Sequence, residues 1–118
     1  MLVTSRETRR WVLPKGWVEK RSRPDEQAAV EAFEEAGLVG VIRVPSVGSY
    51  RYPKIAHGRA TAVWVDVFLL DVERQCAEWP EKGQRDAVWV PPTEAAEMVA
   101  ERDLAAILAR LEGSLDQR

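Results

Sequence analysis

The chain has 118 residues, of which 46% are hydrophobic and 31% are charged. That length suits one domain, since domains most often hold about 100–150 residues, and the apolar fraction is too high for intrinsic disorder. No apolar run approaches the roughly 20 residues that cross a bilayer, and none follows the first arginines as in a signal peptide. We therefore expect residues 1–118 to form a single cytoplasmic domain with no membrane partner.

Residue types that often build metal sites are scarce. Cys76 and His57 are the only cysteine and histidine. An internal disulfide is thereby excluded, and histidine-based metal sites and Ser-His-Asp triads are disfavoured. Any metal must be held by oxygen ligands, which points to Mg²⁺ or Mn²⁺.

Charge is distributed unevenly along the chain. Residues 1–59 carry 11 Lys/Arg against 7 Asp/Glu, whereas residues 60–118 carry 6 against 12. The first half could attract an anion, although an ordinary surface of mixed charge would give the same counts.

The first elements in chain order are two short strands, Leu2–Thr4 and Trp11–Leu13, around a polar turn. After a charged loop, Pro24–Ala36 has the pattern of a helix, and Gly37 is the usual residue just past a helix end. Ser22 is placed to cap this helix, with an acidic residue three positions later as in a capping box.

The middle of the chain favours β structure. Residues 39–52 suit one or two strands with a bend, and a loop is expected at 53–58. Ala60–Val72 is the strongest strand, with one apolar face that includes Val63, Val65, Val67 and Leu69 and another that includes Trp64 and Phe68. A strand that is apolar on both faces is expected in the centre of a sheet.

A polar loop at 73–84 and a short strand at 87–90 precede the last expected helix. It starts at Pro91–Thr93 and carries an apolar stripe of Leu104, Ile107, Leu108 and Leu111. The order strands, helix, strands, helix predicts a mixed α/β or α+β sandwich with helices on both faces of a sheet.

Three glutamates share one face of the helix at 24–36. At 100° per residue, Glu31, Glu34 and Glu35 fall within about 100° of arc, with alanines and Phe33 on the opposite, core-facing side. Like charges at the i, i+4 spacing of Glu31 and Glu35 repel, so a cation must compensate them or the face must stay hydrated. Such carboxylates could hold Mg²⁺, which would polarise a phosphoanhydride and activate water. The alternative is a solvated helix face.

The residues around these glutamates resemble the signature box of the Nudix hydrolases. The box aligns without a gap over 23 residues, from Gly16 to the run Glu31-Ala32-Phe33-Glu34-Glu35-Ala36-Gly37-Leu38. The resemblance implies an α+β fold, an α/β/α sandwich around a mixed sheet. It also implies hydrolysis of a nucleoside or other diphosphate linked to a further group, with Mg²⁺ or Mn²⁺ as cofactor.

The resemblance also assigns roles to residues. Glu34 and Glu35 would be the main metal ligands, Glu31 a ligand or the general base, and the Gly16 backbone carbonyl would complete the metal site. Trp17 could stack on a substrate ring or pack on the helix. The basic side chains that could hold substrate phosphates are Arg6, Arg10, Lys15, Lys20, Arg51 and Lys54. The expected partner is a small phosphoanhydride molecule and not a specific nucleic acid.

Two positions depart from the box. Ser22 stands where the family has its first glutamate, and Val30 where it has an arginine that orients the neighbouring carboxylates by charge-assisted hydrogen bonds. A valine cannot do this, and the charged residues near the box that could compensate for the departures are Glu19, Lys20, Arg21 and Arg23. The departures motivate an alternative function, a catalytically impaired Nudix domain that binds a nucleotide or acts as a regulatory module.

The segment at 78–95 resembles the branch that hydrolyses diphosphoinositol polyphosphates and diadenosine polyphosphates, so we expect a substrate of one of these types. A nucleoside triphosphate or capped-RNA pyrophosphohydrolase is a further option. Family members usually have another strand before Leu2–Thr4. That strand is missing, is supplied by another subunit, or belongs to a longer chain, and an uncovered strand edge favours a homodimer.

Overall fold

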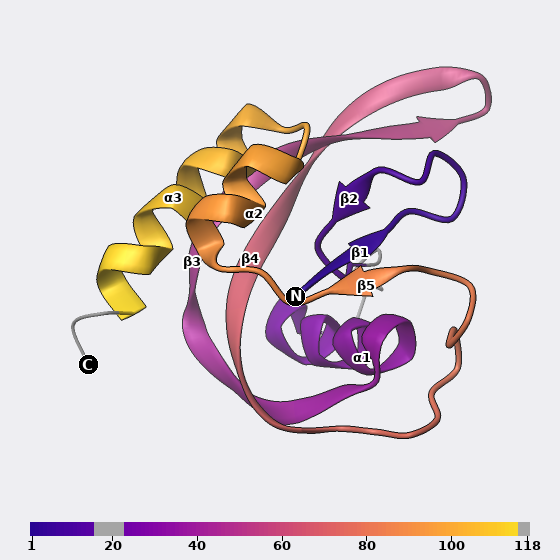
Figure 1. Ribbon diagram of the computed structural model, residues 1–118. Helices are drawn as coiled ribbons and strands as arrows, with labels where there is room; N and C mark the ends of the chain where they lie inside the picture. The colour runs from indigo at the N-terminus through magenta and orange to yellow at the C-terminus, as the bar shows by residue number, and fades with distance from the viewer. Residues whose placement is uncertain (16–22, 116–118) are drawn as a thin grey trace.

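The computed structural model describes residues 1–15 and 23–115 and contains two sheets and three helices. In the first sheet β1 (Leu2–Thr4) lies between β2 (Trp11–Val12) and β5 (Ala87–Val88), antiparallel to both. Figure 1 shows this small sheet at the centre of the molecule, with α1 on one side. The two short N-terminal strands expected from the sequence are confirmed, although the second is one residue shorter than expected.

The second sheet is a long antiparallel ribbon of β3 (Leu38–Ala56) and β4 (Arg59–Gln75). It curves around the first sheet and α1 (Figure 1). The pairing register shifts between Val39 and Gly40 and again between Arg43 and Gly48, which bends the ribbon. The loop expected at 53–58 is wrong, because the strands stay paired to the tip. Only His57 and Gly58 form the turn, both with positive φ, as a type I′ hairpin turn requires.

The expected central position of β4 is also wrong. Among the described residues β4 pairs only with β3. Val67 on one face is buried, but Trp64 on the other is 67% exposed. Apolar residues on both faces of a strand therefore do not distinguish a central strand of a sheet from a strand of a two-stranded ribbon.

Helix α1 (Pro24–Ala36) has the bounds expected from the sequence. Its N-cap is Arg23, whose side chain makes no capping hydrogen bond, and the expected cap Ser22 lies outside the described residues. The single helix expected after Pro91 is wrong, because the chain forms α2 (Pro92–Met98) and α3 (Arg102–Leu115). The break follows from Val99, which is extended and forms a parallel bridge with Trp11. Among the described residues no helix is long and apolar enough to span a membrane.

Two core clusters lie on opposite faces of β1. Leu2 packs with Tyr50 and the buried side chains of α3, including Leu104 and Ile107. The next residue, Val3, points the other way and joins a cluster that comprises Val12, Ala32, Ala36 and Leu38. Because successive strand residues face opposite sides, α1 covers one face of the sheet and α3 the other. The expected α+β class with helices on both faces is confirmed.

The end of β4 and the loop after it bind the C-terminal end of α1. The Glu81 N–H donates to the Glu34 carbonyl at 3.0 Å, the Gln75 side-chain amide to the Ala36 carbonyl at 3.0 Å, and the Cys76 N–H to the Gly37 carbonyl at 2.8 Å. Carbonyls at a helix end lack partners within the helix, so this loop supplies them. The loop is thereby held beside the glutamates of α1.

Gly37 ends α1 in the left-handed conformation, with φ +72°. A Cβ at this position would lie 2.4 Å from Cε3 of the Trp79 ring, which belongs to the bound loop. Two independent constraints, the backbone angle and the ring contact, therefore require glycine here.

Candidate active site

Helix α1 places its three glutamates in different environments. Glu35 is only 4% exposed, whereas Glu31 and Glu34 are half-buried. Phe33, expected in the core, is 36% exposed. The buried face of α1 is therefore rotated from the expected one, and it carries Glu35 into the protein together with Ala32 and Ala36.

The Glu35 carboxylate has two partners from distant parts of the chain. The Lys15 backbone N–H donates to Oε2 at 3.2 Å, and Nη1 of Arg85 lies 3.5 Å from Oε1. Lys15 follows β2 and Arg85 precedes β5, so the buried carboxylate joins the helix to the ends of two strands. A buried charge needs such partners, since desolvation is otherwise costly.

Glu31 and Glu35 form a carboxylate pair. Gln27 donates to Glu31 Oε1 at 2.7 Å. Burial, and next a hydrogen bond with the Glu31 side chain, raises the pKa of Glu35 to about 8, against the lowering effect of Arg85. At neutral pH Glu35 therefore keeps its proton in the metal-free protein, and a divalent cation could take the place of that proton.

These residues fit a Mg²⁺ or Mn²⁺ ion as a partial ligand set. Among residues 1–15 and 23–115, no group of three or more His, Cys, Asp or Glu side chains is gathered in a way that could hold a metal. Glu34 thus does not complete a three-carboxylate cage with Glu31 and Glu35, and Gly16, the expected carbonyl ligand, lies outside the described residues. Mg²⁺ is commonly bound by one or two carboxylates with water and substrate oxygens, so two carboxylates suffice.

The Glu35 shift predicts how pH changes the stability of the metal-free protein. Between about pH 4.5 and about pH 8 the folded state keeps the Glu35 proton, whereas the unfolded state has lost it. The free energy of unfolding should therefore fall as pH rises through this range, by a few kcal/mol. Urea unfolding with a chelator at pH 5, 6.5 and 8 measures this. In Glu35→Gln the free energy of unfolding should decrease much less over this pH range. An equal decrease in both proteins would contradict the raised pKa of Glu35.

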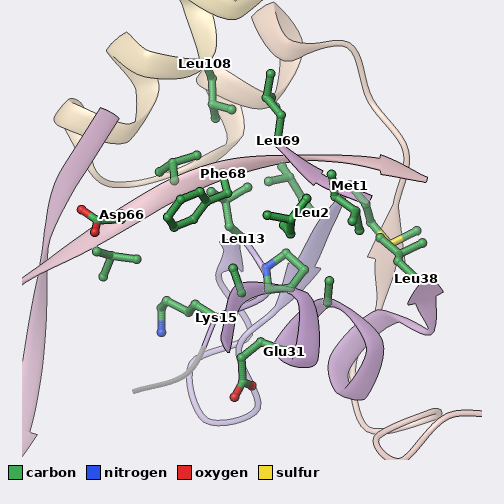
Figure 2. A pocket seen from close by; sticks show the side chains of 18 of the residues that line it. Met1, Leu2, Leu13, Lys15, Glu31, Leu38, Asp66, Phe68, Leu69 and Leu108 are labelled. Atoms are coloured by element: carbon green, nitrogen blue, oxygen red, sulfur yellow. The ribbon is translucent and has the colours of Figure 1, made fainter. Parts of the chain in front are cut away.

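A cavity of about 420 Å³ opens beside this pair, between α1, β1 and β4. Figure 2 shows the charged ends of Lys15 and Glu31 at one end of it, pointing away from Leu2, Phe68 and Leu69. The apolar body resembles protein core and does not suit a polyphosphate. The polar end, at Lys15 and Glu31, is where a phosphate and a cation would be stabilised.

The expected phosphate-binding side chains are placed unequally. Lys15 lies at the carboxylate pair, and its Nζ stands 3.7 Å from the centroid of the Tyr52 ring. Arg6 donates to the Gln84 side chain at 3.0 Å and lies 3.9 Å from Glu81, on the loop that carries Arg85.

The other expected cations lie elsewhere. Arg10 pairs with Glu101 at 3.7 Å, at the start of α3. Arg51 stands over the Trp64 ring, 6.0 Å from its centroid, on the ribbon. Trp17, Lys20 and the side chain of Lys54 lie outside the described part of the structure.

Arg85 is the site residue whose role sequence reasoning missed. The compensating cations were sought close to the box, but Arg23 pairs instead with Asp25 at 3.1 Å and Glu26 at 3.8 Å at the start of α1. Arg85 is 50 positions after Glu35, and no helical or strand spacing relates the two. Its place in the segment at 78–95 was the available signal, and that signal pointed to the substrate and not to Glu35.

Comparison with known proteins agrees with the signature box. The family model of the NUDIX domain matches residues 1–111. Among curated Arabidopsis thaliana proteins, Nudix hydrolase 13, mitochondrial, is 29% identical over 108 residues, which cover 83% of this chain and 52% of the relative. Nudix hydrolase 4 is 30% identical over 98 residues (83% and 46%), and Nudix hydrolase 16, mitochondrial, is 32% identical over 93 residues (73% and 49%). The chain thus spans about half the length of these relatives.

Proposed function

Since the chain belongs to the Nudix family, we propose that it is a metal-dependent pyrophosphohydrolase that cleaves a phosphoanhydride in a small molecule. The observation that carries the proposal is the carboxylate pair of Glu31 and Glu35. Glu35 is buried and has a pKa raised to about 8, and its neighbour Glu31 lies with Lys15 at the polar end of a cavity. Paired hard ligands beside a cation suit a phosphate and a divalent ion together.

The proposed roles of the site residues are metal binding, phosphate orientation and proton transfer. Glu35 and Glu31 would hold Mg²⁺ or Mn²⁺, with the Gly16 carbonyl as a further ligand. When bound, the ion would neutralise phosphate charge and make water a better nucleophile. Lys15 and Arg6 would orient the phosphates. Glu31, if not fully engaged as a ligand, would accept the proton of the water that attacks phosphorus, while the bridging P–O bond breaks and the leaving phosphate takes its electron pair.

The substrate we propose is a polyphosphate-bridged molecule, such as a dinucleoside polyphosphate or a diphosphoinositol-type compound. Two features support it. The segment at 78–95 resembles that branch of the family, and this segment is bound to α1 beside the proposed site. Arg6 and Lys15 bring positive charge from two other segments to the same region.

A substrate panel tests this function. The protein is incubated with Mg²⁺ or Mn²⁺ and with diadenosine tetraphosphate, a diphosphoinositol polyphosphate, nucleoside triphosphates or capped RNA, and the products are separated by anion-exchange chromatography. We expect metal-dependent cleavage of the bridged compounds above all others. Preference for triphosphates or capped RNA would support the other enzymatic option. Binding without release across the whole panel would support the alternative motivated by Ser22 and Val30, a nucleotide-binding or regulatory module.

A homodimer and a cytoplasmic location are part of the same proposal. Size-exclusion chromatography with light scattering at several protein concentrations tests the dimer, and fluorescence imaging of the tagged protein in cells tests the location.

A further inference from the structure

The signature-box arginine has no counterpart on α1. Val30 occupies its position, is 45% exposed and cannot form a hydrogen bond through its side chain. The nearest described basic residue before the helix, Arg23, is engaged by two acidic side chains in the first turn. Within residues 1–15 and 23–115, a cation that orients the glutamates therefore has to come from another element.

Arg85 supplies a cation to Glu35 from the other side of the site. The two side chains are 11% and 3% exposed, and Nη1 of Arg85 lies 3.5 Å from Oε1 of Glu35. Because both side chains are buried, water screens the Arg85 charge poorly, and that charge acts strongly on the Glu35 carboxyl group. The Lys15 N–H holds the second oxygen of the same carboxylate.

The Arg85 guanidinium is itself fixed by two further acceptors. Nη1 donates to the Thr4 carbonyl at 3.1 Å, Nε donates to Glu81 Oε1 at 3.0 Å, and Nη2 lies 2.9 Å from the same oxygen. Only arginine has enough N–H groups in one rigid plane to make all these contacts. The group is therefore oriented before any ligand arrives.

Backbone hydrogen bonds fix the base of Arg85 as well. Asp86 N–H donates to the Thr4 hydroxyl at 2.9 Å, and Thr4 N–H donates to the Asp86 carbonyl at 2.9 Å. On the other side, the Glu81 N–H is bonded to α1. The segment that carries Arg85 is thus attached both to β1 and to the helix that carries Glu35.

From these contacts we propose that Arg85 is a positioning residue. It holds the Glu35 carboxylate ready for the divalent ion and so takes the role that an arginine at position 30 would have. The proposal rests on the proposed function for the metal role of Glu35. In this protein the orienting positive charge would thus lie in the segment before β5, and not on α1 as in the signature box.

Mn²⁺ affinity provides the test, measured by electron paramagnetic resonance of the free ion without substrate. Arg85→Gln should bind Mn²⁺ roughly 10–100-fold more weakly, as loss of a residue that orients a ligand does. A purely electrostatic role predicts the opposite sign, because removal of a nearby positive charge should strengthen cation binding. Unchanged or tighter binding by the folded variant would overturn the proposal.

A matched control separates positioning from attachment of the loop. Arg9, in the turn between β1 and β2, lies 2.8 Å from Asp86 and donates to the Gln84 carbonyl at 3.3 Å, so Arg9→Gln removes an arginine that contacts the same loop but leaves Glu35 untouched. Its Mn²⁺ affinity should equal that of the wild type. If Arg85→Gln does not fold, Arg85→Lys retains a positive charge but not the planar fork. It should fold and still bind weakly, and wild-type affinity would overturn the proposal.

Rescue tests whether positions 30 and 85 exchange roles. Val30→Arg is a change on an exposed position, and in the Arg85→Gln background it should recover most of the Mn²⁺ affinity. If the folded double variant recovers no Mn²⁺ affinity, Arg85 does not take the role of an arginine at position 30. The readout is ion binding and not hydrolysis, so the two hypotheses can fail separately. A wild type that binds Mn²⁺ but hydrolyses no substrate would refute the enzymatic function, and the Mn²⁺ affinity of Arg85→Gln would still decide the role of Arg85. An active wild type with an unaffected Arg85→Gln would refute the role of Arg85 alone.

Discussion

Glu35→Gln should lower metal-dependent phosphoanhydride hydrolysis on the order of 10²–10⁴-fold. Glutamine has nearly the shape of glutamate and keeps an oxygen that can accept from the Lys15 N–H. It cannot carry the negative charge that a divalent ion requires, while Arg85 keeps its ion pair with Glu81. Initial rates of product release at saturating Mg²⁺ measure the effect.

The same variant excludes unfolding as the cause of lost activity. In the metal-free protein at pH 8, a neutral side chain at position 35 avoids the cost of ionising a buried carboxyl. Glu35→Gln should thus be at least as stable as the wild type while it is far less active. A matched control is Glu78→Gln, because the Glu78 side chain is 86% exposed on the neighbouring loop. Turnover should be unchanged in the control, and unchanged turnover in Glu35→Gln would refute the catalytic assignment.

The second large effect is expected at Gly37. Alanine there must adopt φ +72°, which costs about 1–2 kcal/mol. The added Cβ would also lie too close to the Trp79 ring, which must move away. Overpacking of this kind adds about 1–3 kcal/mol. We expect Gly37→Ala to lower the free energy of unfolding by roughly 2–4 kcal/mol, as measured by urea denaturation.

Gly58→Ala is the matched control for this change. Gly58 has nearly the same backbone angle, φ +74°, but a Cβ there meets nothing within 4 Å among the described residues. The difference between the two variants therefore isolates the ring contact. Equal losses of stability would show that Trp79 does not press on the helix end.

Local signals in the sequence were sufficient to predict the bounds of α1. Proline at the start and Gly37 at the end mark α1 to the residue, and the box spacing points to Glu35. The burial of Glu35 could not be predicted in the same way. A helical wheel places it beside Glu31 and Glu34, but the loop that covers it comes from residues 76–86, and that contact depends on the tertiary fold.

The errors have a common physical origin in long-range contacts. Val99 ends α2 because it pairs with Trp11, 88 positions earlier in the chain. The apolar faces of β4 gave no information on how many strands would pair with it. Arg85 reaches Glu35 only because the loop after β4 binds the end of α1. Propensity and periodicity describe residues that are close in sequence, whereas each of these contacts joins residues that are far apart in the chain.

The hydrogen bonds from Cys76 and Glu81 to the end of α1 have a dynamic consequence. The last turn of this helix cannot fray without release of the loop that aligns the acid and the guanidinium. Opening of this helix end would therefore also disrupt the proposed ion site. A ligand that binds only the closed arrangement would protect both amides from exchange with solvent deuterium, even though neither amide touches it.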